Sequence, residues 1–293
     1  MSKKNTDRRF IQLGEQIQDG LYGPDAIKDA ETYSNISNSR IEPFLKNIND
    51  FYSKEINPIF RPYPLALIEI ILTLFFKNNS KDQDLSDCFA LIFQKNIEGT
   101  KKTCIKDKYI NMLDAGHASK QSLKTGNPLI IWELAKSSFL AYNEFLNVLI
   151  GTILINYRFA IGKKYKFSSL DNPYGNKVNE LIELNPEGDC YKFLFELLQP
   201  EIRNAIGHQT IWFDKSKGIV TYLNDKTGLN ETLSIEDFIQ LDAKASYLAE
   251  AYLVSISTIA VFSIGTPEDK TRLPKELFLL IMDIVAPKEK PSC

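Results

Sequence analysis

One long helical pattern, from Trp132 to Gly162, constrains the fold of this chain more than any other feature. Within it, large apolar residues recur every three or four positions, a spacing that places them on one side of an α-helix. They are Leu134, Phe139, Tyr142, Phe145, Leu146, Leu149, Ile153 and Leu154. A helix of about 45 Å needs several partners to bury such a face. The pattern therefore predicts a helical bundle.

Other helical stretches supply those partners. The expected helices are Leu65–Lys77, Asp84–Ile97, Asn176–Leu184, a segment that Asp189 caps and that runs through Leu198, Ser234–Ser263 and Glu276–Ile284. Residues 1–42 predict only a short helix followed by a loop. Glu98–Pro128 has the weakest pattern and contains His117, for which a loop or surface position is expected.

The hydrophobic period changes from helical to alternating at Thr210. Thr210–Phe213 and Ile219–Leu223 flank the turn Asp214–Gly218, which predicts a β-hairpin. A second turn, Asn224–Gly228, leads to a brief third strand expected near Leu233. We therefore predict a mainly α-helical protein that carries a small β-hairpin.

Composition limits the number of domains and the cellular location that we expect. The chain has 293 residues, of which 44% are hydrophobic, and a net charge of −2, so one or two domains are expected and no overall basic field favours nucleic acid. Met1–Phe10 is charged and lacks the apolar core of a signal peptide. The four cysteines, Cys88, Cys104, Cys190 and Cys293, lack the spacing of a zinc site or a disulfide framework. These features predict a cytoplasmic protein.

Three apolar stretches have the hydrophobicity of membrane spans but are better explained as buried helices. Leu65–Phe76 and Phe145–Ile155 are too short to cross a bilayer. Leu248–Ile264 carries Glu250 and several hydroxyl side chains. We therefore expect no membrane partner.

The residues that carry chemistry lie between the helical and the alternating regions. The segment Pro200–His208 places Arg203, Asn204 and His208 in the pattern R-N-x-x-x-H. A guanidinium binds phosphate through a planar fork of donors, and an imidazole changes charge near neutral pH. Both properties suit chemistry on a phosphodiester. On a straight helix Arg203 and His208 are about 140° apart, so we expect Gly207 to end the helix and redirect His208.

This motif and its surroundings, roughly from Trp132 to Ile264, resemble the HEPN family of ribonucleases. The resemblance implies a composite site across a homodimer, with no metal and no cofactor. There Arg203 would hold the scissile phosphate, His208 would move a proton, and Asn204 would fix their geometry. RNA would be cleaved by its own 2′-hydroxyl to a 2′,3′-cyclic phosphate. Such enzymes serve as toxins or anti-phage effectors that a cognate inhibitor restrains.

Supporting residues are chosen by position. Family members carry a further polar residue from an earlier helix, for which Asn143, Glu144 and Asn147 are candidates, although a solvated helix face explains each of them equally well. RNA contact is expected at local basic clusters, where a solvated face is again the alternative. The two clusters are Lys101, Lys102, Lys106 and Lys108, and Arg158, Lys163, Lys164 and Lys166.

The sequence predicts three regions. They are a helical N-terminal region (1–125) with a regulatory or partner-binding role, a HEPN-like domain (129–265), and a short C-terminal helix with a tail (266–293). Two alternatives to a ribonuclease stay open: an inactive HEPN-like module for RNA binding or dimerisation, and an unrelated fold. The motif itself also has a purely structural alternative, in which Arg203 pairs with Glu201 or Glu196, Asn204 caps a turn and His208 bonds to a hairpin carbonyl. No nucleotide-binding glycine motif or hydrolase motif favours a different enzyme.

Overall fold

A computed structural model describes residues 41–91, 105–184, 194 and 198–286 of the chain. Several expectations fall outside these residues: the helix and loop before residue 41, the end of the helix predicted to reach Ile97, the Asp189 cap, and the tail after residue 286. Cys104, Cys190 and Cys293, with Lys101, Lys102 and Glu196, also lie outside them.

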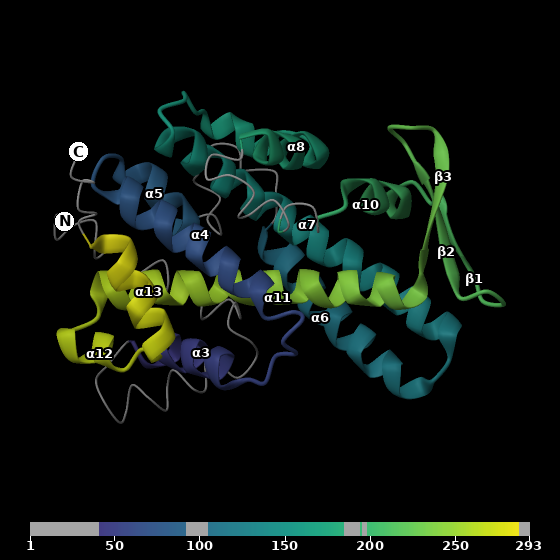
Figure 1. Cartoon of the computed structure of the whole chain (residues 1–293), viewed down its shortest axis with the longest axis horizontal. Helices are drawn as coiled ribbons and strands as arrows, with labels where there is room; N and C mark the ends of the chain where they lie inside the picture. The colour runs from purple at the N-terminus through teal and green to yellow at the C-terminus, as the bar shows by residue number, and fades with distance from the viewer. Residues whose placement is uncertain (1–40, 92–104, 185–193, 195–197, 287–293) are drawn as a thin grey trace, which may run out of the picture.

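The described chain is mainly α-helical, as predicted, and carries a small antiparallel sheet (Figure 1). Its helices are α3 (Glu42–Ser53), α4 (Pro62–Asn79), α5 (Gln83–Leu91), α6 (Ile105–Ser122), α7 (Pro128–Ala160), α8 (Tyr174–Leu184), α10 (Pro200–Gly207), α11 (Ile235–Ile264), α12 (Pro267–Thr271) and α13 (Lys275–Val285). Short 3-10 turns η1 (Leu123–Thr125) and η2 (Phe167–Asp171) precede and follow α7.

Two long helices, α7 and α11, form the framework. In α7 the Asn127 side chain accepts a hydrogen bond from the Leu129 amide, and Pro128 occupies the first turn, where its missing amide hydrogen costs nothing. In α11 the Ser234 hydroxyl accepts from the Asp237 amide at 3.0 Å, so Ser234 caps the helix that was expected to begin there. Figure 1 shows α11 running along the molecule from the sheet to α12.

Both long helices are long and apolar enough to cross a membrane. Of the most apolar 18-residue stretch in each helix, however, 78% in α7 and 72% in α11 is buried inside the protein. Such burial is typical of core helices in water-soluble proteins. It agrees with the prediction of buried helices.

The main core crosses the predicted boundary near residue 125. Phe44 and Ile48 of α3, with Ile71 of α4, belong to the same buried cluster as Phe145 of α7 and Tyr252 of α11. A buried polar contact also joins the two sides, because the Asn78 amide donates to Oδ1 of Asn156 at 3.0 Å. The N-terminal and central regions thus share one hydrophobic interior.

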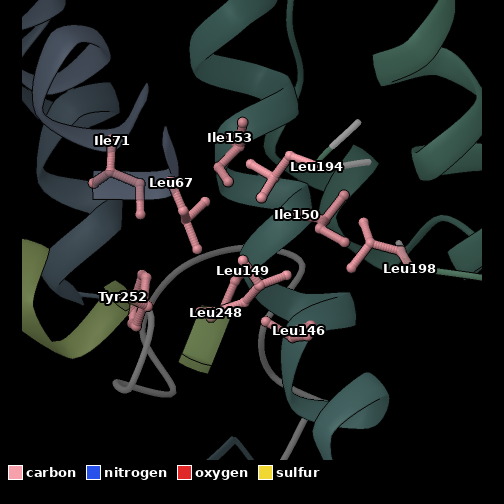
Figure 2. A pocket seen from close by; sticks show the side chains of 10 residues that line it. All are labelled: Leu67, Ile71, Leu146, Leu149, Ile150, Ile153, Leu194, Leu198, Leu248 and Tyr252. Carbon is pink, nitrogen blue, oxygen red and sulfur yellow. The ribbon is translucent and has the colours of Figure 1, made fainter. Parts of the chain in front are cut away.

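A small apolar cavity remains in that core (Figure 2). Nine aliphatic side chains and Tyr252 surround a volume of about 20 Å³. That volume admits little more than one water molecule, and the lining offers water almost no polar partner. We therefore regard it as a packing defect and not as a ligand site.

The sheet is a meander of three antiparallel strands, β1 (Ile211–Asp214), β2 (Ile219–Asn224) and β3 (Leu229–Ser234), so the brief strand expected near Leu233 spans six residues. Alternate residues of β2 are buried, and Val220 and Tyr222 pack in a second cluster with Trp132 of α7 and Phe238 of α11. Ile202, Ala205 and Ile206 of α10 complete that cluster. This packing fixes the helix that carries the R-N-x-x-x-H motif.

Candidate functional site

Helix α10 positions the motif and is bounded by two residues with left-handed backbones. Gln199 precedes it with φ 35°, and Pro200 fills its first turn. At the other end the Thr210 amide bonds to the Ala205 carbonyl and the Gln209 amide to that of Ile206. These two bonds form a Schellman motif. Gln209, with φ 60°, takes the left-handed position.

The prediction that Gly207 turns the chain is therefore only half right. The helix does end at Gly207, but the reversal occurs two residues later, at Gln209. The His208 amide still bonds to the Asn204 carbonyl at 2.8 Å, as in a continuing helix. His208 consequently keeps its helical direction, about 140° around the axis from Arg203.

Arg203 points toward α7, where it forms an ion pair with Glu144. Its Nη1 also donates to Oδ1 of Asn204 at 3.1 Å. Its Nε is buried and has no hydrogen-bond partner in the described chain. Of the three candidates on α7, Glu144 is thus the one that contacts the motif. Glu201, the partner considered for Arg203, instead pairs with Lys226 at 2.5 Å.

Glu144 lies between two cations. Its second carboxylate oxygen accepts from Nζ of Lys108, on α6, at 3.0 Å. Burial by itself would raise the pKa of Glu144, but the hydrogen bonds from Arg203 and Lys108 lower that pKa below its ordinary value. The carboxylate is therefore ionised at neutral pH. One negative charge thus faces two positive ones, which leaves a positive excess beside the motif.

His208 lies away from this cluster. Its side chain is exposed at the end of α10, next to the start of the sheet. Within the described part of the chain, no hydrogen bond or ion pair joins His208 to Arg203. One copy of the chain brings together Arg203, Asn204 and Glu144 but does not bring His208 to them.

Asn143 and Asn147 have structural contacts next to the cluster. The Asn143 amide donates to the Phe139 carbonyl, and its oxygen accepts from the hydroxyl of Tyr174 at 2.5 Å. The Asn147 carbonyl accepts from Nζ of Lys177 at 2.7 Å. The side-chain oxygen of Asn147 is buried and has no hydrogen-bond partner in the described chain.

Lys177 adds a third positive charge close to the motif. Its side chain is only 2% exposed, and burial followed by the nearby charge of Lys108 lowers its pKa to about 8. At pH 7 most molecules therefore carry a buried ammonium, held by the carbonyls of Asn147 and Leu170. Burial also raises the pKa of the Tyr174 hydroxyl well above its ordinary value.

The second candidate cluster for RNA binding lies away from the motif. Arg158 pairs with Glu180, and its Nε donates to the Lys164 carbonyl at 2.8 Å. Lys163, Lys164 and Lys166 are exposed after the end of α7. Along α7, Arg158 is about 21 Å from Glu144, so this cluster and the motif form separate basic surfaces.

Sequence reasoning missed Tyr174 and Lys177, and it grouped Lys108 only with a surface cluster. Tyr174, Lys177, Val178 and Leu181 follow the i, i+3, i+4, i+7 spacing of one buried helix face. That spacing is visible in the sequence and marks Lys177 as a lysine on an apolar face. No comparable signal pairs Lys108 with Glu144, because the segment around α6 has a weak hydrophobic pattern.

Among the described residues, no group of three or more His, Cys, Asp or Glu side chains is gathered as a metal ion requires. Comparison of the chain with protein-family models, with curated proteins and with solved structures finds no match.

Proposed function

We propose that this protein is a metal-independent endoribonuclease of HEPN type, with Arg203 and His208 at its centre. The observation that carries the proposal is that Arg203 of the R-N-x-x-x-H motif contacts both Asn204 within the motif and Glu144 of α7. A partly buried carboxylate that orients a guanidinium, as Glu144 orients Arg203, is the kind of support that a phosphate-binding arginine needs.

The charges around Arg203 suit a phosphodiester. Arg203 and Lys108 outnumber the carboxylate of Glu144 that both of them contact, and Lys177 lies close by with Asp171 as a further negative charge near it. Such an excess stabilises the additional negative charge of a pentavalent phosphorus in the transition state. Arg203 exposes 27% of its side chain, so an RNA phosphate can approach its edge.

His208 would supply proton transfer. It takes the proton from the 2′-hydroxyl or gives one to the departing 5′-oxygen, and the products are a 2′,3′-cyclic phosphate and a 5′-hydroxyl. Because Arg203 and His208 point apart within one chain, the working site combines Arg203 of one copy with His208 of a second. Trp212, four residues after His208, is 49% exposed, which favours an interface with that second copy.

A second candidate function is an inactive HEPN-like module for RNA binding or dimerisation. One observation favours it: Glu144 already neutralises Arg203, as a purely structural ion pair does. The biological setting follows from the family resemblance alone. We propose a cytoplasmic toxin or anti-phage effector with a cognate inhibitor.

The test is cleavage of total RNA and tRNA in the presence of EDTA. Wild type is compared with His208→Ala, and His117→Ala serves as the matched control because His117 is also exposed on a helix. We expect cyclic-phosphate ends from wild type and from His117→Ala, and at least about a hundredfold less cleavage by His208→Ala. Equal cleavage by all three proteins would contradict the proposal, and no cleavage by any of them would favour the inactive module.

A complementation experiment tests the composite site. Arg203→Ala and His208→Ala are each expected to be inactive. In a re-equilibrated mixture, half of the dimers carry both variants, and in each of these one site keeps an intact Arg203 and an intact His208. About a quarter of wild-type activity should therefore return. A site formed within one chain would remain inactive in the mixture.

A further inference from the structure

A second cavity, of about 280 Å³, opens on the other side of α7 from the motif. Its volume is near the lower end of the roughly 300–1,000 Å³ that is typical of small-molecule sites. Helices α6, α7 and α11 form its walls, and Lys54 at the end of α3 closes one side. Ser119, Ser138, Tyr142, Asp242 and Ser246 supply its polar lining.

Two of these polar side chains are buried and incompletely bonded. Asp242 is 8% exposed and Ser138 is fully buried. Oδ2 of Asp242 accepts from the Ser119 hydroxyl at 3.1 Å. Its Oδ1 and the hydroxyl oxygen of Ser138 make no hydrogen bond of ordinary geometry within the described chain, although Ser138 lies close enough to Asp242 to lower its pKa. Buried polar atoms are rarely left unpaired, so these two mark a place where a ligand donates hydrogen bonds.

The charges around the cavity constrain the ligand. Burial raises the pKa of Asp242 to about 6 against the opposing effects of Ser138, Ser119 and Lys120, so the carboxylate is mostly ionised at pH 7. Lys54 is already paired with Glu250 at 2.9 Å. Lys120, on α6, is exposed and forms no ion pair within the described residues. The interior is thus negative, and the exposed ammonium of Lys120 lies on its wall.

We propose that this cavity binds a small molecule with a planar N–H donor head and an anionic end. The head donates to Asp242 and Ser138, and the anionic end faces Lys120. Tyr142 and Tyr247 provide the aromatic walls that a flat group needs. A guanine nucleotide and free arginine share this chemistry.

The proposal is independent of ribonuclease activity. On α7, Tyr142 lines the cavity, and Glu144 pairs with Arg203 only two positions later. Two positions correspond to about 200° around a helix, so the two residues face opposite sides. Ligand binding can therefore be measured on a protein that cleaves no RNA.

The test is isothermal titration calorimetry of the full chain with GMP and with L-arginine. Guanosine and agmatine lack the anionic end of these probes, and AMP and L-norleucine lack the donor head. We expect saturable binding of GMP or L-arginine at concentrations below about 1 mM, and weaker binding of every control compound. The probe that binds shows whether the donor head of the ligand is a guanine base or a guanidinium group.

Asp242→Asn should weaken that binding about tenfold or more, because it removes a charge-assisted hydrogen bond while keeping the side-chain size. Asp225→Asn, an exposed carboxylate in the β2–β3 turn, is the matched control and should have no effect. Lys120→Ala, at an exposed position, gives a second variant that does not disturb the core. No binding of either probe by the folded protein, or unchanged affinity in both cavity variants, would overturn the proposal.

Discussion

Glu144 of α7 and Arg203 of α10, 59 residues apart in the sequence, form the ion pair that attaches the R-N-x-x-x-H motif to the helical framework. Both side chains are less than one-third exposed, so solvent screens their attraction only in part. Removal of either partner leaves a charge without compensation. The contribution of the pair to the free energy of unfolding is therefore measurable by mutation.

A double-mutant cycle of Glu144→Gln and Arg203→Ala should give a coupling of about 1 kcal/mol in urea unfolding at pH 7. The pKa of Glu144 is lower in the folded protein, so this contribution is present above the unfolded pKa of about 4.3 and is lost as pH falls through the folded value. The exposed pair Lys46–Asp50 serves as control and should show almost no coupling. Zero coupling for Glu144 and Arg203 would mean that the motif is held by apolar packing alone.

Asp242→Asn should stabilise the protein at pH 7. The folded pKa of about 6 lies above the unfolded value, so the folded state binds more protons between roughly pH 4 and 6 and loses stability as pH rises through that window. The variant lacks this loss, and its advantage at pH 7 should be on the order of 3 kcal/mol. Thermal unfolding from pH 4 to pH 8 measures the difference, which should vanish at the acidic end.

Gln209→Gly should stabilise the protein by roughly 0.5–1 kcal/mol, because glycine adopts a positive φ without the steric penalty that glutamine carries there. Gly207→Ala provides the contrast. A β-carbon at Gly207 meets no atom within 4 Å, so alanine should be tolerated or slightly stabilising. Marked destabilisation by Gly207→Ala would restore the sequence-based prediction that Gly207 turns the chain.

Gly116→Ala should destabilise the protein by about 1–3 kcal/mol, because the new β-carbon would lie 2.3 Å from the hydroxyl oxygen of Tyr142. That hydroxyl belongs to a buried ring between α6 and α7. Tyr142→Phe removes the atom in conflict and should restore part of the loss in the double variant. Chemical denaturation of the two single variants and the double variant measures the rescue. Additive effects would place the clash elsewhere.

The sequence predicted those elements whose own residues determine them. Helices α7 and α11 have clear apolar periods, and the β1–β2 turn depends on Asp214 and Gly218, whose types suit it. Helix α6 was missed because its apolar residues are sparse and Gly116 interrupts them. Gly116 is there because α7 approaches so closely that Tyr142 fills the space of a side chain. That cause lies in a partner helix, beyond the reach of a local pattern.

The residues of the candidate site could be named from the sequence, but their pairing could not. The spacing of Arg203, Asn204 and His208 suggested phosphate chemistry, and Glu144 was named together with Asn143 and Asn147. Nothing in one sequence separates these three, because only the position of α10 beside α7 decides which of them meets Arg203. The reversal at Gln209 was also hidden, since glycine and not glutamine usually occupies such a position.

Because α6 and α7 contribute residues to both the motif and the cavity, the substitutions that this protein can accept in them are restricted. Lys108 and Ser119 lie on α6, and Ser138 and Glu144 lie on α7, so each helix serves the motif with one residue and the cavity with another. A substitution that turns or slides either helix alters both places together. The motif and the cavity therefore cannot evolve independently, and we expect a substitution at one of them to be accompanied by a compensating substitution at the other.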